Sequence, residues 1–457
     1  MFKIYKMKGE VSQMRKTLRK IISGMLALSM VFCLASCSGG NSPSSSSSDG
    51  SSKAESEESG APEGDVTLNM LSHTYAALEY YADQMKTKAP EGVTVNAEMT
   101  NYTDWQEKMR LNLASNAASY DITYITPQDI AEFAANGWLE PLDEYVEKYW
   151  DEYNFGDIPQ YLWDAYSYDG HIYGIPSHQW AMILFYRTDL FDDAGLSVPE
   201  TLDELVADAE ALNKDGRSGI TLTLQASDML MVTYQSFLTA CGGWFWDDDY
   251  NPTFSGEASL KAIDYLQQLY QYTPDDSSSY GNNEATVAMG QDLAAMTMMQ
   301  TTRSSSMNDP EQSTVVGKVA FASAPSLEKG GASAAIWNTA GYSICKFTEN
   351  DIDTCFKTIA NATDEESSIG GADSGMPCRE AALTDELLAE RTDYDAAWKA
   401  IQSGATLRPT IPEFSEIMEV SMTALSSVLT GQGDAATAMA EVDKEVREIL
   451  DDAGYYD

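Results

Sequence analysis

Short strand-like runs alternate with helix-like runs at the start of the folded part of this chain, and this alternation limits the fold more than any other feature. Three runs rich in apolar and β-branched residues are followed by three segments with helical periodicity. The strand-like runs are 66–73, 93–100 and 120–126, and the helical ones are 74–90, 102–116 and 127–146. Within the second helical segment, Trp105, Met109 and Leu113 recur at four-residue spacing. This pattern predicts a parallel, doubly wound α/β sheet.

Polar and aromatic residues follow each of these strands. In doubly wound sheets, ligands bind beyond the carboxyl ends of the strands. We therefore expect the residues that follow these strands to face a ligand. They are His73 and Tyr75 after the first strand, Tyr102 after the second, and 126–128, including Gln128, after the third.

The rest of the chain continues the α/β pattern. Two β-rich runs lie within 170–191 and are joined by the segment SHQW. The next helix carries a capping box, because Thr201 is followed three residues later by Glu204. Further helices are predicted at 257–272, 413–431 and 438–454.

The amino-terminal segment has the order of a bacterial export signal. Four basic residues between Arg15 and Lys20 precede an apolar run at 21–34, which is too short for a comfortable membrane span. The motif Leu34-Ala35-Ser36-Cys37 resembles a lipobox, which implies that 1–36 is removed and Cys37 is lipidated. The alternative is an ordinary signal peptide, and Met14 is a second candidate start. Nine serines between Ser38 and Ser52 predict a solvated tether over 37–65.

Length and charge limit the class of protein further. About 390 residues follow the tether, more than one core usually covers, so two lobes are expected. The net charge is −43 for the whole chain. It becomes −49 after removal of 1–36, which carries seven basic residues and one acidic residue. Such a surface repels nucleic acid and anionic lipids.

The chain contains none of the short motifs that would mark an enzyme or a metal site. Its three histidines form no H-E-x-x-H, and there is no G-x-S-x-G, phosphate-binding loop or C-x-x-C. The acidic run after Asp247 departs from a calcium loop, so no cofactor or metal is predicted. Four cysteines allow three full pairings, and we expect zero or one bridge; they are Cys241, Cys345, Cys355 and Cys378.

Several segments, taken in order, resemble extracellular solute-binding proteins of the maltose-binding type, the lipoprotein receptors of carbohydrate importers. They are YTDWQEKM, YDITYIT, GWLEPLDEYV, GHIYGIP with LFYRTDLFDDAGLSVPETLDEL, CGGWFWDDD, AAMTMMQTT, GKVAFASAP and IPEFSEIM with VLTGQGDAATAMAEVDKEV. The segments AMTMMQTTR, SHQWAM and AAIWNTAGY depart from the family pattern.

The resemblance implies a type II two-lobe fold in which each lobe is a mixed sheet flanked by helices. The chain would cross between lobes near 177–180, 335–340 and 408–411. Lobe one would then comprise 66–178 plus 340–407, and lobe two 179–339 plus 408–457.

A sugar needs aromatic faces for its C–H surface and planar polar groups for its hydroxyls. Trp244 follows a diglycine where the family commonly has a stacking aromatic, although a core role is the alternative. Trp180 and Trp337 lie at predicted crossovers, where packing is an equal alternative. The remaining candidates are the amides Gln128, Gln179, Gln300 and Asn338 and the arginines Arg303 and Arg379. Arg379 stands at a position where the family often has an arginine facing the cleft.

The leading hypothesis is a monomeric, lipid-anchored receptor at the outer face of the cell membrane. It would capture a carbohydrate, by preference an oligosaccharide, and deliver it to an ABC permease. One alternative is a receptor of the same fold for a peptide, polyamine or organophosphate. A surface hydrolase is the third.

Overall fold

The structure, a computed structural model, describes residues 66–456. The described residues form one compact unit with a continuous hydrophobic core. The predicted signal peptide, the tether and the lipidated Cys37 lie outside the described residues. No helix among the described residues is long and apolar enough to cross a membrane.

One large sheet organises the amino-terminal part. Strands β1 (Val66–His73), β2 (Val93–Thr100) and β3 (Ile122–Ile125) run parallel, as predicted. The sheet then continues through antiparallel strands in the order β10-β6-β9-β3-β1-β2, so it is mixed. The added strands are β6 (Ile175–Arg187), β9 (Trp337–Ile344) and β10 (Met376–Pro377).

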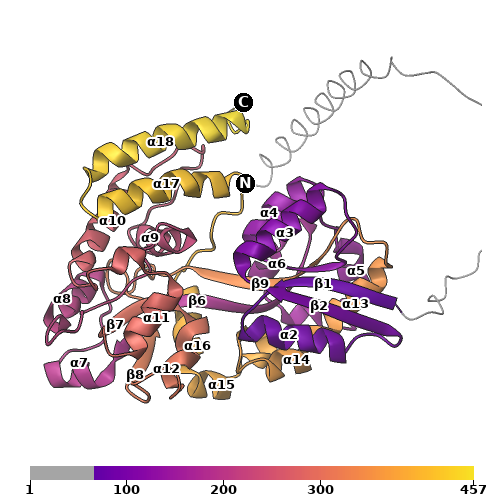
Figure 1. The fold of residues 1–457 in the computed structure, drawn as a ribbon, viewed down its shortest axis with the longest axis horizontal. Coiled ribbons are helices and arrows are strands. Elements are labelled where there is room, and N and C mark those ends of the chain that lie inside the picture. Colours follow the sequence, from indigo (N-terminus) through magenta and orange to yellow (C-terminus); the bar gives the residue numbers. More distant parts are fainter. Residues whose placement is uncertain (1–65, 457) are drawn as a thin grey trace, which may run out of the picture. The chain divides into compact units, whose positions relative to one another are not determined.

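Strand β6 belongs to two sheets. Its first half pairs with β9 and β10, and its second half lies between β7 (Met296–Gln300) and β8 (Val319–Ser323). Figure 1 shows β6 and β9 running from one half of the molecule into the other. We call the elements around β1, β2, β3 and β9 the first lobe, and those around β7 and β8 the second lobe.

Helices cover both faces of the first-lobe sheet (Figure 1). Asn101 caps α3 by accepting a hydrogen bond from the Asp104 backbone, and Trp105, Met109 and Leu113 are fully buried, as their spacing predicts. The smaller elements of this lobe are α2 (Ala76–Thr87), α3 (Tyr102–Ala114), α4 (Pro127–Ala135), α5 (Asp143–Lys148), η1 (Phe155–Asp157), α6 (Gln160–Ala165), β4 (Ser167–Tyr168), β5 (His171–Ile172), α13 (Ile352–Ala362), α14 (Glu365–Gly370) and η4 (Glu380–Ala382).

The second lobe is mostly helical. The predicted capping box is present, since Thr201 and Glu204 bond reciprocally at the start of α8. Its elements are α7 (Thr188–Ala194), α8 (Leu202–Leu212), α9 (Asp228–Ala240), α10 (Glu257–Tyr270), η2 (Ser277–Ser279), α11 (Asn282–Gly290), η3 (Thr301–Arg303), α12 (Ser304–Asn308), α15 (Asp385–Glu390), α16 (Thr392–Gln402), α17 (Phe414–Leu429) and α18 (Ala435–Asp452).

The lobe division predicted from sequence differs from the packing at one point. Helix α16 lies within the span 340–407 that was assigned to lobe one, yet it packs against β8, β6 and η3 of the second lobe. The third crossover therefore precedes Thr392 instead of lying near 408–411. Sequence periodicity shows that α16 is amphipathic, but it does not show which sheet covers its apolar face.

Candidate functional site

Strand register brings three of the predicted residues, together with Met182, onto one face of the crossing strands. Trp180 of β6 pairs with Asn338 of β9, and Met182 of β6 pairs with Gln300 of β7. Residues two apart on a strand share a face, and so do directly paired residues on antiparallel strands. We call the face that carries Trp180, Met182, Asn338 and Gln300 the hinge face.

Two amide side chains at the hinge face each keep one unbonded polar atom. Gln128, in the first turn of α4, accepts a hydrogen bond from Asn338 Nδ2 at 3.0 Å, which leaves its Nε2 buried without a partner. Gln300 contacts the sulfur of Met229 through Nε2 at 3.6 Å, and its Oε1 is buried and unpaired. Unpaired buried polar atoms are rare and costly. One donor and one acceptor are thus left open, one from each lobe.

Aromatic rings gather where β1 and β2 end. The His73 ring lies 5.1 Å from Tyr75 and 5.7 Å from Tyr102, both edge-on. Tyr75 Oη is 2.7 Å from Nε2 of His178, and burial lowers the pKa of His178 to about 3. His178 is therefore a neutral hydrogen-bonding partner throughout the physiological pH range.

Charged groups of the second lobe lie opposite these rings. Burial lowers the pKa of His73, and the positive charge of Arg303 lowers it further. Burial raises the pKa of Tyr102, with Asp129 and Asp228 adding to the effect. Asp228, at the start of α9, pairs with Arg408, whose Nη1 lies 2.9 Å from Asp228 Oδ2. Arg303 Nη1 donates to Asn283 at 3.2 Å.

Sequence reasoning did not select Asp228, Met229 or Arg408. In a chain with 71 acidic residues a single aspartate carries no signal. Arg408 lies within the predicted crossover at 408–411, and this position is the sequence feature that could have identified it as a site residue.

Two other predicted residues lie on the opposite face of the crossing strands. Gln179 is fully buried and satisfied, since its Oε1 accepts from Tyr161 at 2.8 Å and its Nε2 donates to the Pro377 carbonyl at 2.8 Å. Trp337 pairs with Ala181 and packs edge-on against Tyr161 at 5.0 Å. Trp180 and Trp337 therefore do not line one common surface, because strand side chains alternate between faces.

Arg379 and Trp244 lie apart from the hinge face. Arg379 is 1% exposed, and it donates to the carbonyls of Thr363 and Asn154 at 2.9 Å each. Its Nη2 is buried without a partner, and its role in binding stays a prediction that such complete burial does not favour. Trp244 packs edge-on against Phe245 beyond the carboxyl end of α9, whereas the other end of that 13-residue helix, about 20 Å away, carries Asp228. Its binding role stays a prediction that this placement does not favour.

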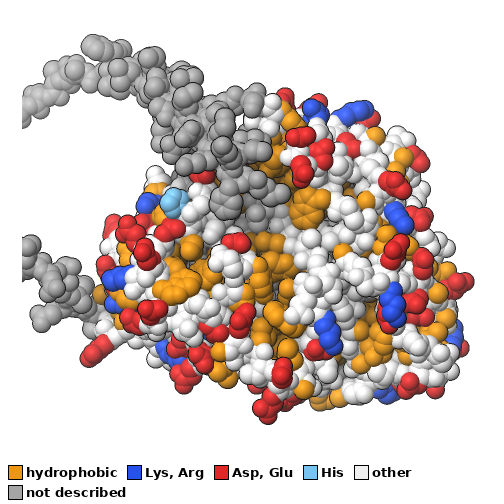
Figure 2. Space-filling model, turned by 180° about the vertical axis from the view of Figure 1, so that it is seen from behind, with side chains coloured by type: hydrophobic (Ala, Val, Ile, Leu, Met, Phe, Trp, Pro, Cys, Tyr) orange, Lys and Arg blue, Asp and Glu red, His pale blue; other side chains and the backbone are white. Residues whose placement is uncertain are grey.

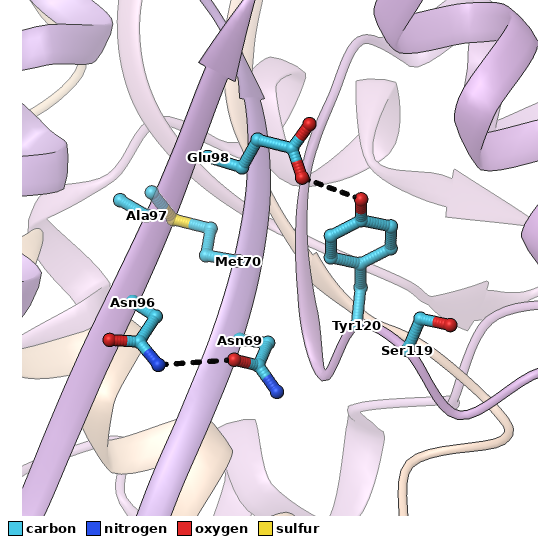
Figure 3. A pocket seen from close by; sticks show the side chains of 7 residues that line it. All are labelled: Asn69, Met70, Asn96, Ala97, Glu98, Ser119 and Tyr120. Atoms are coloured by element: carbon cyan, nitrogen blue, oxygen red, sulfur yellow. Dashed lines mark hydrogen bonds between the residues drawn. The ribbon is translucent and has the colours of Figure 1, made fainter.

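An open groove on the first-lobe sheet lacks the unpaired polar atoms that mark the hinge face. It is lined by Asn69, Met70, Asn96, Ala97, Glu98, Ser119 and Tyr120 (Figure 3). Its polar groups bond to one another: Tyr120 donates to Glu98 at 2.7 Å, and Asn96 to Asn69 at 3.3 Å. It also lies along the strands instead of at their carboxyl ends.

The four cysteines Cys241, Cys345, Cys355 and Cys378 are free thiols. No group of His, Cys, Asp and Glu side chains in residues 66–456 is arranged to hold a metal ion.

Two lobes that share strand β6, with open polar groups from both lobes at the crossing, define a two-lobe binding protein. Comparison with known proteins agrees with this class. The family described as bacterial extracellular solute-binding protein matches residues 72–365. The chain belongs to this family, whose members bind solutes and are not enzymes.

Individual relatives cover most of the chain. A mannitol-binding protein of Pseudomonas aeruginosa is 28% identical over 378 aligned residues, covering 77% of this chain and 85% of that protein. A solute-binding protein of an ABC transporter from Agrobacterium radiobacter, solved with ribitol, has a TM-score of 0.76 and 25% identity over 85% of this chain and all of that one. The maltose-bound MalE3 of T. maritima shares the fold, with a TM-score of 0.75 and 22% identity over 84% of this chain and 100% of that one.

Proposed function

We propose that this protein captures a small, neutral, polyhydroxylated solute between its lobes and delivers it to the permease of an ABC transporter. The observation that carries the proposal is the pair of unbonded amide atoms, Nε2 of Gln128 and Oε1 of Gln300. A hydroxyl group both donates and accepts, so adjacent hydroxyls can satisfy both atoms. The half-buried Trp180, which pairs with Asn338 on the hinge face, offers an aromatic face to C–H groups.

The charge at the site supports a neutral solute. His178 is uncharged, the two glutamines are uncharged, and Arg408 is neutralised by Asp228. Arg303, which bonds to the neutral amide of Asn283, is the remaining charge, and a positive charge at the site does not favour a cationic solute. Arg303 adds donors that can reach hydroxyl oxygens. A polyamine would need unpaired carboxylates at the same place.

The relatives favour a sugar alcohol or monosaccharide over a long oligosaccharide. The mannitol-binding relative and the ribitol complex both concern short, linear polyols. The maltose complex supports a second candidate, an oligosaccharide.

A solute panel tests the proposal. Purified chain from Asp65 onward is heated alone and with mannitol, ribitol, maltose, maltotriose, spermidine or a tripeptide. A solute at a hundred times its Kd adds about 2.7 kcal/mol to the free energy of unfolding. We expect mannitol or ribitol to raise Tm and remain chemically unchanged. Stabilisation by spermidine or peptide alone would contradict the proposal, and a hydrolysis product would favour the hydrolase.

We further propose that the protein acts as a monomer on the outer face of the membrane, anchored by lipid at Cys37. The lipobox and the serine-rich tether support this placement. In Figure 2 acidic side chains are spread over the visible face and basic ones are dispersed among them, which does not favour nucleic acid as a partner.

A further inference from the structure

The junction between α15 and α16 carries an arginine that contacts both lobes. Arg391 ends α15 and precedes α16. Its Nη1 donates to the Ala372 carbonyl at 2.8 Å, and its Nε and Nη2 donate to both oxygens of Asp393 at 3.0 and 2.9 Å. Tyr394, whose ring lies 3.8 Å below the guanidinium, donates to the same Ala372 carbonyl at 2.7 Å. We call Arg391, Asp393, Tyr394 and Ala372 the clasp.

The clasp joins two structural units. Ala372 follows α14 in the first lobe, where the adjacent Gly371 packs so closely on the Tyr80 ring that a methyl group would meet it at 2.8 Å. Helix α16 packs against β8 of the second lobe. The bonds from Arg391 and Tyr394 to Ala372 therefore cross from one lobe to the other.

Each end of the clasp abuts one side of the solute site. In the second lobe, Asp393 is 3% exposed and accepts a hydrogen bond from Ser304, which begins α12 directly after the η3 turn. That turn follows Gln300 and contains Arg303.

In the first lobe, Gly375 lies three residues after Ala372. A methyl group there would come within 3.1 Å of the His178 ring, so the backbone packs directly on that ring. His178 in turn bonds to Tyr75. The clasp is thus connected to site residues on both sides, through one contact and a few residues of chain in each lobe.

We propose that Arg391 is a positioning residue for solute capture. It stabilises the arrangement in which the two lobes approach each other, without itself reaching the hinge face. This inference rests on the proposed function only in requiring that a solute binds between the lobes, whatever its chemistry. A solute shifts a two-state equilibrium only by binding one state better, so destabilising the closed state lowers the apparent affinity.

The test compares Arg391→Ala with Arg447→Ala. Arg447 is a suitable control because it also lies on a second-lobe helix, donates to Asn251 at 2.8 Å and sits over the Tyr456 ring at 4.5 Å, all within that lobe. We expect Arg391→Ala to weaken binding of the panel's solute about tenfold or more, mainly through faster dissociation. We expect the Arg447 variant to bind like the parent protein.

Small-angle scattering of the solute-free protein supplies a readout that needs no solute. Arg391→Ala should increase the radius of gyration and Arg447→Ala should not. Tyr394→Phe keeps the ring under Arg391 but removes one hydrogen bond to Ala372. It should change the affinity and the radius of gyration in the same direction as Arg391→Ala, by a smaller factor. This variant keeps the test possible if Arg391→Ala does not fold. Unchanged scattering and unchanged affinity in the folded variants would overturn the proposal. If no solute of the panel binds, that result would count against the proposed function. The scattering comparison would then decide the role of Arg391.

Discussion

Gln128, Gln300 and Gln179 are glutamines with different hydrogen-bond states; Gln300 and Gln179 are buried, and Gln128 is half-buried. Gln179 is satisfied at both ends, while Gln128 and Gln300 each keep one open atom. A satisfied buried amide stabilises the fold, and an unsatisfied one costs free energy until a ligand pairs with it. The difference gives a test in which two glutamines affect binding and the third affects stability alone.

We expect Gln128→Leu and Gln300→Leu each to weaken solute binding about tenfold, because each removes one hydrogen bond to the solute. For Gln300→Leu the free energy of unfolding should stay within about 1 kcal/mol or rise, since an unpaired polar atom is removed. Gln128→Leu also takes the acceptor from Asn338 Nδ2, so it should lower the free energy of unfolding by about 1–3 kcal/mol. Gln179→Leu should likewise lower it by about 1–3 kcal/mol, while affinity changes little. Calorimetric titration and urea unfolding of the three variants check this. Equal loss of affinity in all three would contradict the assignment of the hinge face.

His178 gives a pH dependence whose direction follows from its burial. Its folded pKa is about 3, and its unfolded value is near 6.5. Below pH 6.5 the unfolded chain takes up a proton that the folded chain does not, so stability is lost as pH falls from about 6.5 toward 3. The loss should reach about 2 kcal/mol between pH 7 and pH 5.

His178→Gln should remove this part of the slope, because an amide can still bond to Tyr75 and does not titrate. His171→Gln, at an exposed histidine, should retain it. The measurement is the free energy of unfolding at pH 7, 6 and 5. Parallel curves for all three proteins would show that His178 does not control the slope.

At the residue scale, the sequence predicts a cluster of polar and aromatic side chains where strands end, and contact of these side chains with a solute stays a prediction. His73, Tyr75, Tyr102 and Gln128 follow strand ends, and the structure gathers the three rings there. The sequence does not show that Trp180 and Trp337 lie on opposite faces of the sheet, since this depends on the register in which β6 pairs with β9. Strand register is a non-local property.

At the element scale, α5 and α13 are joined by one aspartate. Asp353 lies in the first turn of α13 and bonds to Lys148 at 2.7 Å, Lys357 at 2.9 Å and the Tyr149 hydroxyl at 2.6 Å. Burial alone would raise the pKa of Asp353, but these hydrogen bonds lower it to about 2.

We expect Asp353→Asn to lower the free energy of unfolding at pH 7 by about 1–2 kcal/mol, allowing for partial solvent screening. The parent protein has this stabilisation above pH 4 and loses it as pH falls from about 4 to 2. The gap between parent and variant should therefore shrink on acidification. Asp395→Asn breaks an exposed pair with Lys399 and should cost at most about 0.5 kcal/mol. A gap that is constant down to pH 3 would contradict this account.

Elements with strong local patterns were predictable from the sequence, and their partners were not. The β1 to α4 alternation and the capping box of α8 depend on neighbouring residues, and both are present. The assignment of α16 to the second lobe depends on contacts with β8, more than 60 residues earlier in the chain. Hydrophobic periodicity identifies a buried face but not what buries it.

At the scale of the whole molecule, the proposed anchor has a direct test. Cys37→Ala should release the protein from the membrane fraction into the medium, because the motif Leu34-Ala35-Ser36-Cys37 makes Cys37 the proposed site of the lipid. The measurement is fractionation of cells at high salt, with Cys241→Ala as the matched control. Persistence of the Cys37 variant in membranes after a salt wash would exclude the lipid as the anchor.

The place of β9 in the sheet has a consequence for biosynthesis. It lies between β3 and β6 in space, yet it is made more than 140 residues after β6. Until Trp337–Ile344 joins the sheet, β3 and β6 each present an open edge toward a missing middle strand. Exposed edges pair readily with other chains. A chain that ends before Trp337 would therefore keep both edges open after export, and the first-lobe sheet closes only in a chain that is delivered through Ile344.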